Sequence, residues 1–134
     1  MRQFILATIL LVFTASIGQA QIIKCKAFSF TYREKISNTS IWTGWSSPIQ
    51  VDILITIDDP NNRIKIYSSQ EQGYDIIKAH GKTVNRNGED VHKWECINDQ
   101  GVRCYVYIIN NNRGKRELSV EFNDLNWKYS INII

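Results

Sequence analysis

The chain has 134 residues and carries 16 lysines and arginines against 13 aspartates and glutamates, a net charge of +3 at pH 7. This length supports one hydrophobic core and is too short for two domains of ordinary size. The charges alternate in sign along the sequence and form no basic run, so a nucleic-acid partner is not expected.

Residues 1–20, MRQFILATILLVFTASIGQA, have the pattern of a secretory signal peptide. Arg2 is followed by an apolar run, and the segment closes on small residues at Ala20. A membrane span would need about 20 uninterrupted apolar residues, and Thr14 and Ser16 end this run early. We therefore expect cleavage after Ala20, a single β-domain over residues 21–134, a secreted or periplasmic location, and no membrane span in the mature chain.

Alternation of apolar and polar residues dominates the sequence after residue 20. In IQVDILITID, residues 49–58, every second side chain is apolar, and DDPNN, residues 58–62, ends the run with turn formers. We expect about eight or nine antiparallel strands joined mostly by short hairpins. A small closed or partly open barrel and a two-sheet sandwich both protect the edges of such strands. The sequential hairpins favour the all-β meander barrel, with the sandwich as the alternative.

Four turns in the second half of the chain predict a register. They are expected at Asn87-Gly88, at residues 99–101, at residues 110–114 and at Asn123-Asp124. The predicted cross-strand pairs are Val84 with Val91, Thr83 with His92, Gly81 with Trp94, Cys96 with Cys104, Val106 with Leu118, and Leu118 with Tyr129. The four turns agree on which face is apolar. This agreement supports the register, because a slip of one residue would turn an apolar set toward water.

Three cysteines occur in the chain. Opposed on neighbouring strands, Cys96 and Cys104 are close enough for a disulfide, which an oxidising compartment favours; two buried thiols are the alternative that the register leaves open. Zinc would need two further ligands, and no C-x-x-C motif is present, so no metal site is expected. Cys25 is then a free buried thiol or a handle for another chain.

One predicted row brings a hydroxyl, an imidazole and a guanidinium to the mouth of the interior. Thr83, His92 and Arg116 would bind the polar, anionic end of a ligand there, since the rigid fork of arginine matches a carboxylate or phosphate. The alternative is that His92 and Arg116 lie at the rim and reach into water. The apolar part of the ligand would be lined by Trp94, Trp127 and Tyr129.

The segment SIWTGWSSP, residues 40–48, holds two tryptophans among small polar residues. If Trp42 and Trp45 are exposed on a loop, they suggest contact with a protein or a carbohydrate, because indole provides a large contact area and one donor. We favour the other interpretation, in which both rings plug one end of the core.

The sequence contains no G-x-S-x-G, H-E-x-x-H, phosphate-binding glycine loop or EF-hand, so neither an enzyme nor a cofactor is expected. The leading hypothesis is a secreted, non-enzymatic protein that binds a small, partly apolar ligand inside the barrel. The alternative is a protein- or glycan-interaction module that uses the Trp42/Trp45 loop or a sheet edge and holds no internal ligand.

Three stretches carry a family resemblance: RIKIYSSQEQGYDII, KWECINDQGVRCYVYII and LSVEFNDLNWKYSINI. They resemble a group of small secreted proteins from bacteria of the Bacteroidota phylum, whose signal peptides fit the GQAQ junction. The resemblance implies a secreted β-domain and carries over no catalytic residues. Similarity to the ligand-binding calycin barrels is one of architecture alone, because the calycin G-x-W is missing and Gly44 and Trp45 are adjacent here.

Overall fold

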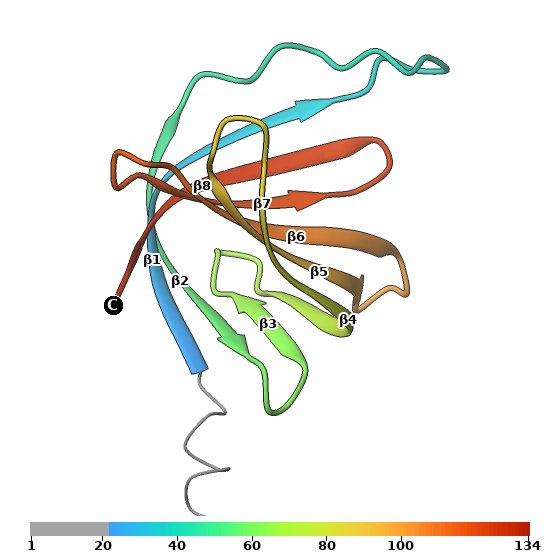
Figure 1. Cartoon of the computed structure of the whole chain (residues 1–134). Coiled ribbons are helices and arrows are strands. Elements are labelled where there is room, and N and C mark those ends of the chain that lie inside the picture. Colours follow the sequence, from blue (N-terminus) through green and yellow to red (C-terminus); the bar gives the residue numbers. More distant parts are fainter. Residues whose placement is uncertain (1–21) are drawn as a thin grey trace, which may run out of the picture.

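The computed structural model describes residues 22–134, and the predicted signal peptide lies outside them. Eight antiparallel strands form the fold: β1 (Ile22–Glu34), β2 (Ile49–Asp58), β3 (Arg63–Ile66), β4 (Gln72–Val84), β5 (Asp90–Asn98), β6 (Arg103–Asn110), β7 (Arg116–Glu121) and β8 (Leu125–Ile133). Each strand pairs with its neighbours in the chain, and β8 pairs with β1 to close the ring (Figure 1). The predicted meander barrel is therefore confirmed, and the sandwich is excluded.

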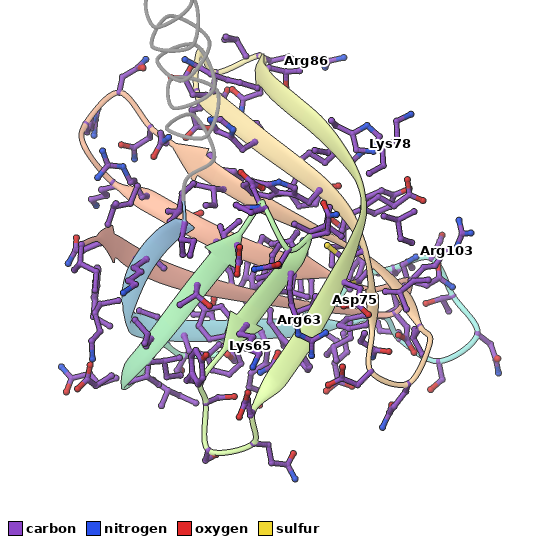
Figure 2. All side chains as sticks on the ribbon, turned by 90° about the horizontal axis from the view of Figure 1, so that it is seen from below. Arg63, Lys65, Asp75, Lys78, Arg86 and Arg103 are labelled. Carbon is purple, nitrogen blue, oxygen red and sulfur yellow. The ribbon has the colours of Figure 1, made fainter. Side chains whose placement is uncertain are left out.

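Alternate residues of every strand point inward and fill most of the barrel. The buried apolar residues are Cys25, Ala27, Ile55, Ile57, Ile64, Ile66, Tyr74, Trp94, Cys96, Cys104, Val106, Ile108, Leu118, Val120, Tyr129 and Ile131. Removing one such side chain from water contributes about 1.5–3 kcal/mol. Charged side chains such as Lys78 and Arg103 project from the outer face (Figure 2). No helix among the described residues is long and apolar enough to cross a membrane.

The barrel wall is shortest at β3. Its four residues pair with only the second half of β2, from Ile55 to Asp58. The amide of Tyr67 donates to the carbonyl of Leu54 (2.9 Å), and the first half of β2 then runs on without a strand neighbour on this side. The wall therefore opens beside residues 49–53.

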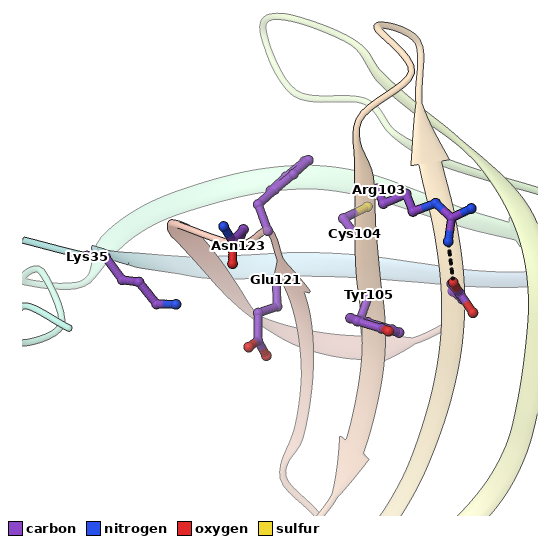
Figure 3. Close-up of a pocket in the computed structure, with 8 residues that line it drawn as sticks. Lys35, Arg103, Cys104, Tyr105, Glu121 and Asn123 are labelled. Atoms are coloured by element: carbon purple, nitrogen blue, oxygen red, sulfur yellow. Dashed lines mark hydrogen bonds and ion pairs between the residues drawn. The ribbon is translucent and has the colours of Figure 1, made fainter. Parts of the chain in front are cut away.

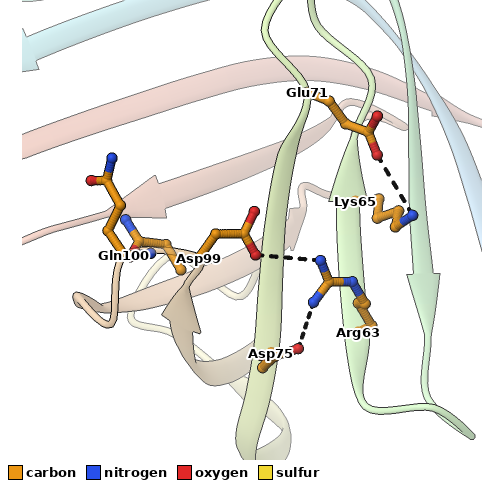
Figure 4. Close-up of polar contacts among 7 residues, drawn as sticks. Arg63, Lys65, Glu71, Asp75, Asp99 and Gln100 are labelled. Atoms are coloured by element: carbon orange, nitrogen blue, oxygen red, sulfur yellow. Dashed lines mark hydrogen bonds and ion pairs between the residues drawn. The ribbon is translucent and has the colours of Figure 1, made fainter.

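Ion pairs brace this short wall from outside (Figure 4). The guanidinium of Arg63 donates to Asp75 (2.6 Å) and lies 3.4 Å from Asp99, while Lys65 lies 3.5 Å from Glu71. Its bond to Asp75 raises the pKa of Arg63 above its ordinary value. One arginine thus connects β3 to β4 and to the turn that follows β5.

Two of the predicted hairpin registers are confirmed. Cys96 pairs with Cys104 across β5 and β6, and Leu118 pairs with Tyr129 across β7 and β8. The β5–β6 turn is the expected three-residue loop, with Gly101 at a φ of 78°.

The predicted β4–β5 register is wrong by one residue. Val84 pairs with Asp90 and Thr83 with Val91, because the loop spans residues 86–88 with Gly88 at a φ of 75°. The same loop places His92 opposite Lys82. Two bulges, between Ala79 and Gly81 and between Ile76 and Lys78, shift the rest of the ladder further, so that Trp94 lies opposite Ala79.

The predicted β6–β7 register is wrong by two residues. Val106 pairs with Val120, and Leu118 pairs with Ile108. The loop is again of three residues, 112–114, with Gly114 at a φ of 76°. A register shift of two residues keeps the same side chains on the inward face. The predicted apolar lining is therefore correct, although each residue pairs with a different partner.

Candidate functional site

The gap in the wall leads into a cleft of about 620 Å³. Three strands and one loop surround it: β1 and β8 on one side, the unpaired half of β2 on another, and the β3–β4 connection across the mouth. Its lining consists of Phe30, Val51, Asp52, Ile53, Ser68, Ser69, Gln70, Gln72, Trp127 and Tyr129. The volume falls within the range of about 300–1,000 Å³ that is usual for small-molecule sites.

The apolar wall of the cleft is largely aromatic. The rings of Phe30 and Tyr129 lie 5.0 Å apart, centroid to centroid, and Trp127 meets Phe122 edge to face at 5.6 Å. Val51 and Ile53 complete the wall from β2, where they pack against the core. Such a surface favours a ligand with a flat or branched apolar part.

A chain of uncharged polar groups lies beside this wall. The hydroxyl of Tyr74 donates to Oε1 of Gln72 (2.6 Å), and Nε2 of Gln72 is shared between Ser68 Oγ (3.2 Å) and the Tyr129 hydroxyl (3.3 Å). Because Tyr129 accepts here, its own proton remains available for an acceptor on a ligand. Burial raises the pKa of Tyr129, which keeps that proton in place at neutral pH.

The structure places the predicted apolar residues in different environments. Trp127 and Tyr129 line the cleft, whereas Trp94 lies in the packed core and is 6 % exposed. The prediction therefore identified one wall of the cleft. It missed the opposite wall and the polar residues of the β3–β4 connection.

The predicted polar end of the ligand site is not assembled. Thr83 is exposed and pairs with Val91; His92 stacks on Trp94 at 6.0 Å; and Arg116 is exposed at the rim, where its Nε donates to Asn110 (2.9 Å). None of the three lines the cleft. The predicted registers had placed Thr83 and Arg116 in one row with His92. The three-residue loops at 86–88 and 112–114 shift both hairpins, so Thr83 lies opposite Val91 and Arg116 opposite Asn110.

The tryptophan loop lies outside the barrel, so the predicted plug is wrong. The loop lies between β1 and β2 in the chain, and it forms hydrogen bonds with the end of β1 that β2 leaves unpaired. The amides of Thr43 and Ser46 donate to the carbonyls of Glu34 (2.7 Å) and Tyr32 (2.8 Å). In return the amides of Glu34 and Tyr32 donate to the hydroxyls of Thr43 (3.1 Å) and Ser46 (3.0 Å). Each tryptophan is thus followed by a hydroxyl residue that fastens the loop to β1.

Both indoles are stacked with cations of the neighbouring strands. The guanidinium carbon of Arg33 lies 4.7 Å from the ring centre of Trp42 and 4.6 Å from that of Trp45. The Nζ of Lys35 lies 5.2 Å from the Trp42 ring, and that of Lys128 lies 4.1 Å from the Trp45 ring. We call these five side chains the cation–indole ladder.

All three cysteines are buried and free in the structure. The predicted opposition of Cys96 and Cys104 is confirmed, and the predicted disulfide between them is not formed here. Burial raises the pKa of Cys96 and of Cys104 to about 12 and raises that of Cys25 as well. Thiols so rarely ionised near neutral pH are poor nucleophiles. Among residues 22–134, no group of histidine, cysteine and carboxylate side chains could hold a metal ion.

A second, smaller hollow of about 310 Å³ lies where β6 begins beyond the end of β7 (Figure 3). Lys35, Arg103, Glu95 and Glu121 border it, and Cys104 lies at its edge. Arg103 donates to Glu95 (3.3 Å), so part of this charge is already paired. Its mixed charge distinguishes this hollow from the largely uncharged cleft.

No protein-family model, no curated protein and no solved structure matches this chain. The functional argument therefore depends on the geometry and chemistry of the cleft and of the outer surface.

Proposed function

We propose that the protein binds a small, partly apolar, uncharged ligand in the cleft beside β2. The observation that carries this proposal is the break in an otherwise filled core: the inward faces of β1, β2 and β8 leave room for a molecule between aromatic and aliphatic walls. A barrel can bind a ligand only where its own side chains leave space.

The lining favours a neutral ligand over the anionic one expected from the sequence. Ser68, Gln72 and the Tyr129 hydroxyl provide uncharged donors and acceptors at the apolar wall. Asp52 is the one charged residue of the lining, and its carboxylate is paired with Lys26 at 2.9 Å. A ligand with a hydroxyl, ether or amide oxygen near an apolar ring or chain would satisfy these groups.

The signal-like first twenty residues support action outside the cytoplasm, on a ligand met after export. Binding is the activity we propose, since the cleft combines hydrogen-bonding groups with apolar walls.

The test fills the cleft and compares binding of a neutral apolar fluorophore, N-phenyl-1-naphthylamine. Val51→Trp places an indole in the cleft, and Val102→Trp adds the same side chain in the exposed β5–β6 turn as a matched control. We expect saturable binding by the native protein and by Val102→Trp, and at least about tenfold weaker binding by Val51→Trp, because a bulky group in the site excludes the probe.

Native mass spectrometry of exported protein gives an independent readout. A bound compound that is lost on denaturation, and is absent from Val51→Trp, would identify the natural ligand class. Equal probe binding by both variants, with both folded, would show that the cleft is not the site.

A further inference from the structure

The cation–indole ladder on the outer face of β1 and β8 lies apart from the proposed ligand site. It uses Arg33, Lys35 and Lys128, whereas the inward side chains of the same strands, such as Phe30 and Trp127, face the cleft. The ladder also leaves Trp45 38 % exposed. An exposed surface that combines cations with aromatic rings is a candidate site for contact with another molecule.

The three cations of the ladder have no acidic partner in the part of the chain that the structure describes. Among the other described cations, Lys26, Arg63, Lys65, Lys82 and Arg103 pair with a carboxylate, whereas several, such as Lys78, Arg86 and Lys115, do not. The ladder differs from these in that its three unpaired cations share two indole rings. The Nε of Arg33 is buried without a hydrogen-bond partner among residues 22–134. The guanidinium is therefore positioned by the two rings, and none of the three cations has a described carboxylate within ion-pair distance, although Glu34, Glu121 and Asp124 line hollows that Lys35 also borders.

The three cations follow the outer face of β1: Arg33 and Lys35 are alternate residues of one segment, and Lys128 pairs with Thr31, the preceding residue on that face. Each cation lies between 4.1 and 5.2 Å from the centre of an indole that it shares with the next cation. Side chains on one face of an extended segment repeat every ~7 Å, so Arg33 and Lys35 match carboxylates at alternate residues of an extended peptide.

We propose that the ladder is a docking surface for an extended acidic peptide segment of a partner protein, with carboxylates paired to Lys35, Arg33 and Lys128. Charge complementarity carries the proposal. Each indole already has two cations of the protein within 5.2 Å of its ring centre, and these cations compete with a sugar or a base for the ring. The carboxylates of Glu95 and Glu121 border the hollow beyond Lys35, and their repulsion would direct the acidic segment from Lys35 toward Lys128.

The test measures binding of a short peptide of alternating glutamate and serine at low ionic strength, by calorimetry, with the glutamine version of the peptide as a control. Lys35→Gln/Lys128→Gln removes two ladder cations and leaves Arg33 between the tryptophans. Lys78→Gln/Lys115→Gln removes the same charge from exposed residues of β4 and the β6–β7 turn. Thermal unfolding confirms that both variants are folded.

We expect the native protein to bind the glutamate peptide and not the glutamine peptide, with an affinity that falls as salt is added. The ladder variant should bind about three- to tenfold more weakly, as expected for the loss of two exposed ion pairs, and the control variant should bind almost as well as the native protein. Absence of binding by the native protein, or equal losses in the two variants, would overturn the proposal. So would preferential binding of a sulfated oligosaccharide, which would identify a glycan as the partner.

Discussion

The two walls of the barrel differ in how far their strands run together. Across β5 and β6 eight residue pairs form a continuous ladder, whereas β2 and β3 share four. The apolar alternation is similar in both walls, yet it produces a packed core behind the long ladder and an open cleft beside the short one. Strand length, more than apolar content, therefore decides where this barrel can admit a ligand.

The polar run SSQEQG, residues 68–73, explains the short wall. The strand β3 has only four residues, and this run begins soon after it ends. The run supplies no apolar side chain that could cover the first half of β2. Ser68 and Gln72 instead form hydrogen bonds at the mouth of the cleft. The same residues that end the wall thus provide the polar part of the site, which ties the architecture of this region to its proposed function.

The largest effect is expected in the well-paired wall at alkaline pH. Burial raises the pKa of Cys96 and Cys104 to about 12, from the ordinary cysteine value of 9.0 that holds in the unfolded chain. Between these values only the unfolded state loses the protons, so stability declines as pH rises above 9. The two thiols together should lower the free energy of unfolding by roughly 4 kcal/mol between pH 9 and pH 11.

The measurement is urea unfolding in reductant at several pH values. Cys96→Ala/Cys104→Ala should lose much of this slope, and the remainder should come from the other groups whose pKa burial raises, Cys25, Tyr74, Tyr107 and Tyr129. The same experiment on oxidised protein tests the predicted disulfide, because a bond between the two sulfurs would remove both titrations. A slope unaffected by the double substitution would contradict the assignment.

A matched pair of substitutions in β2 compares the two regions directly. Ile57 is fully buried opposite Ile64, whereas Ile53 lines the cleft. Ile57→Ala should cost about 2–5 kcal/mol, because it leaves a cavity in a packed core. Ile53→Ala should cost only about 1 kcal/mol, since space is already present there.

Chemical denaturation gives both free energies of unfolding, and the N-phenyl-1-naphthylamine titration gives the second comparison. Ile53→Ala should weaken probe binding although the protein remains stable. Equal losses of stability at the two positions would indicate that the cleft is closed in solution, and the contrast between the walls would then disappear.

A smaller effect is expected at the turns. In three hairpins the Oδ1 of an asparagine accepts hydrogen bonds from two backbone amides, and a glycine with positive φ closes the loop. The pairs are Asn85 with Gly88, Asn98 with Gly101, and Asn111 with Gly114. Asn98→Ala removes two hydrogen bonds and should cost roughly 1–2 kcal/mol in urea unfolding. Asn98→Asp keeps the acceptor and serves as the control. A loss below the error of the measurement would show that glycine alone specifies the turn.

This Asn-x-x-Gly pattern also explains how far the register could be predicted. At residues 99–101 the sequence predicted a three-residue loop that Gly101 closes, and the β5–β6 pairing was correct. At Asn85 the dipeptide Asn87-Gly88 suggested a two-residue turn, but the Asn85 side chain selects the three-residue loop. Of the two bulges in β4, one includes Gly81 at a φ of 75°, whereas the other, between Ile76 and Lys78, contains no glycine or proline.

The site was predictable on one wall only. Trp127 and Tyr129 were identified because the β7–β8 turn fixes their face. Phe30, Val51 and Ile53 belong to strands whose inward faces were visible as alternation, but nothing local shows that β3 is too short to cover them. The cleft depends on the relative lengths of β2, β3 and β4, and this is a property of the assembled wall.

The smallest effect is expected from the charges that brace the short wall. Arg63 bridges Asp75 and Asp99 at the surface, and exposed pairs of this kind contribute about 0–1 kcal/mol because water and salt screen them. Arg63→Met should therefore lower stability by less than about 1 kcal/mol, with Arg63→Lys as a control that keeps the charge but lacks the fork. If β3 is held mainly by its buried residues Ile64 and Ile66, the loss will be small and will shrink further in salt. A loss of several kcal/mol would instead mean that the ion pairs maintain this side of the barrel, and that the width of the cleft responds to ionic strength.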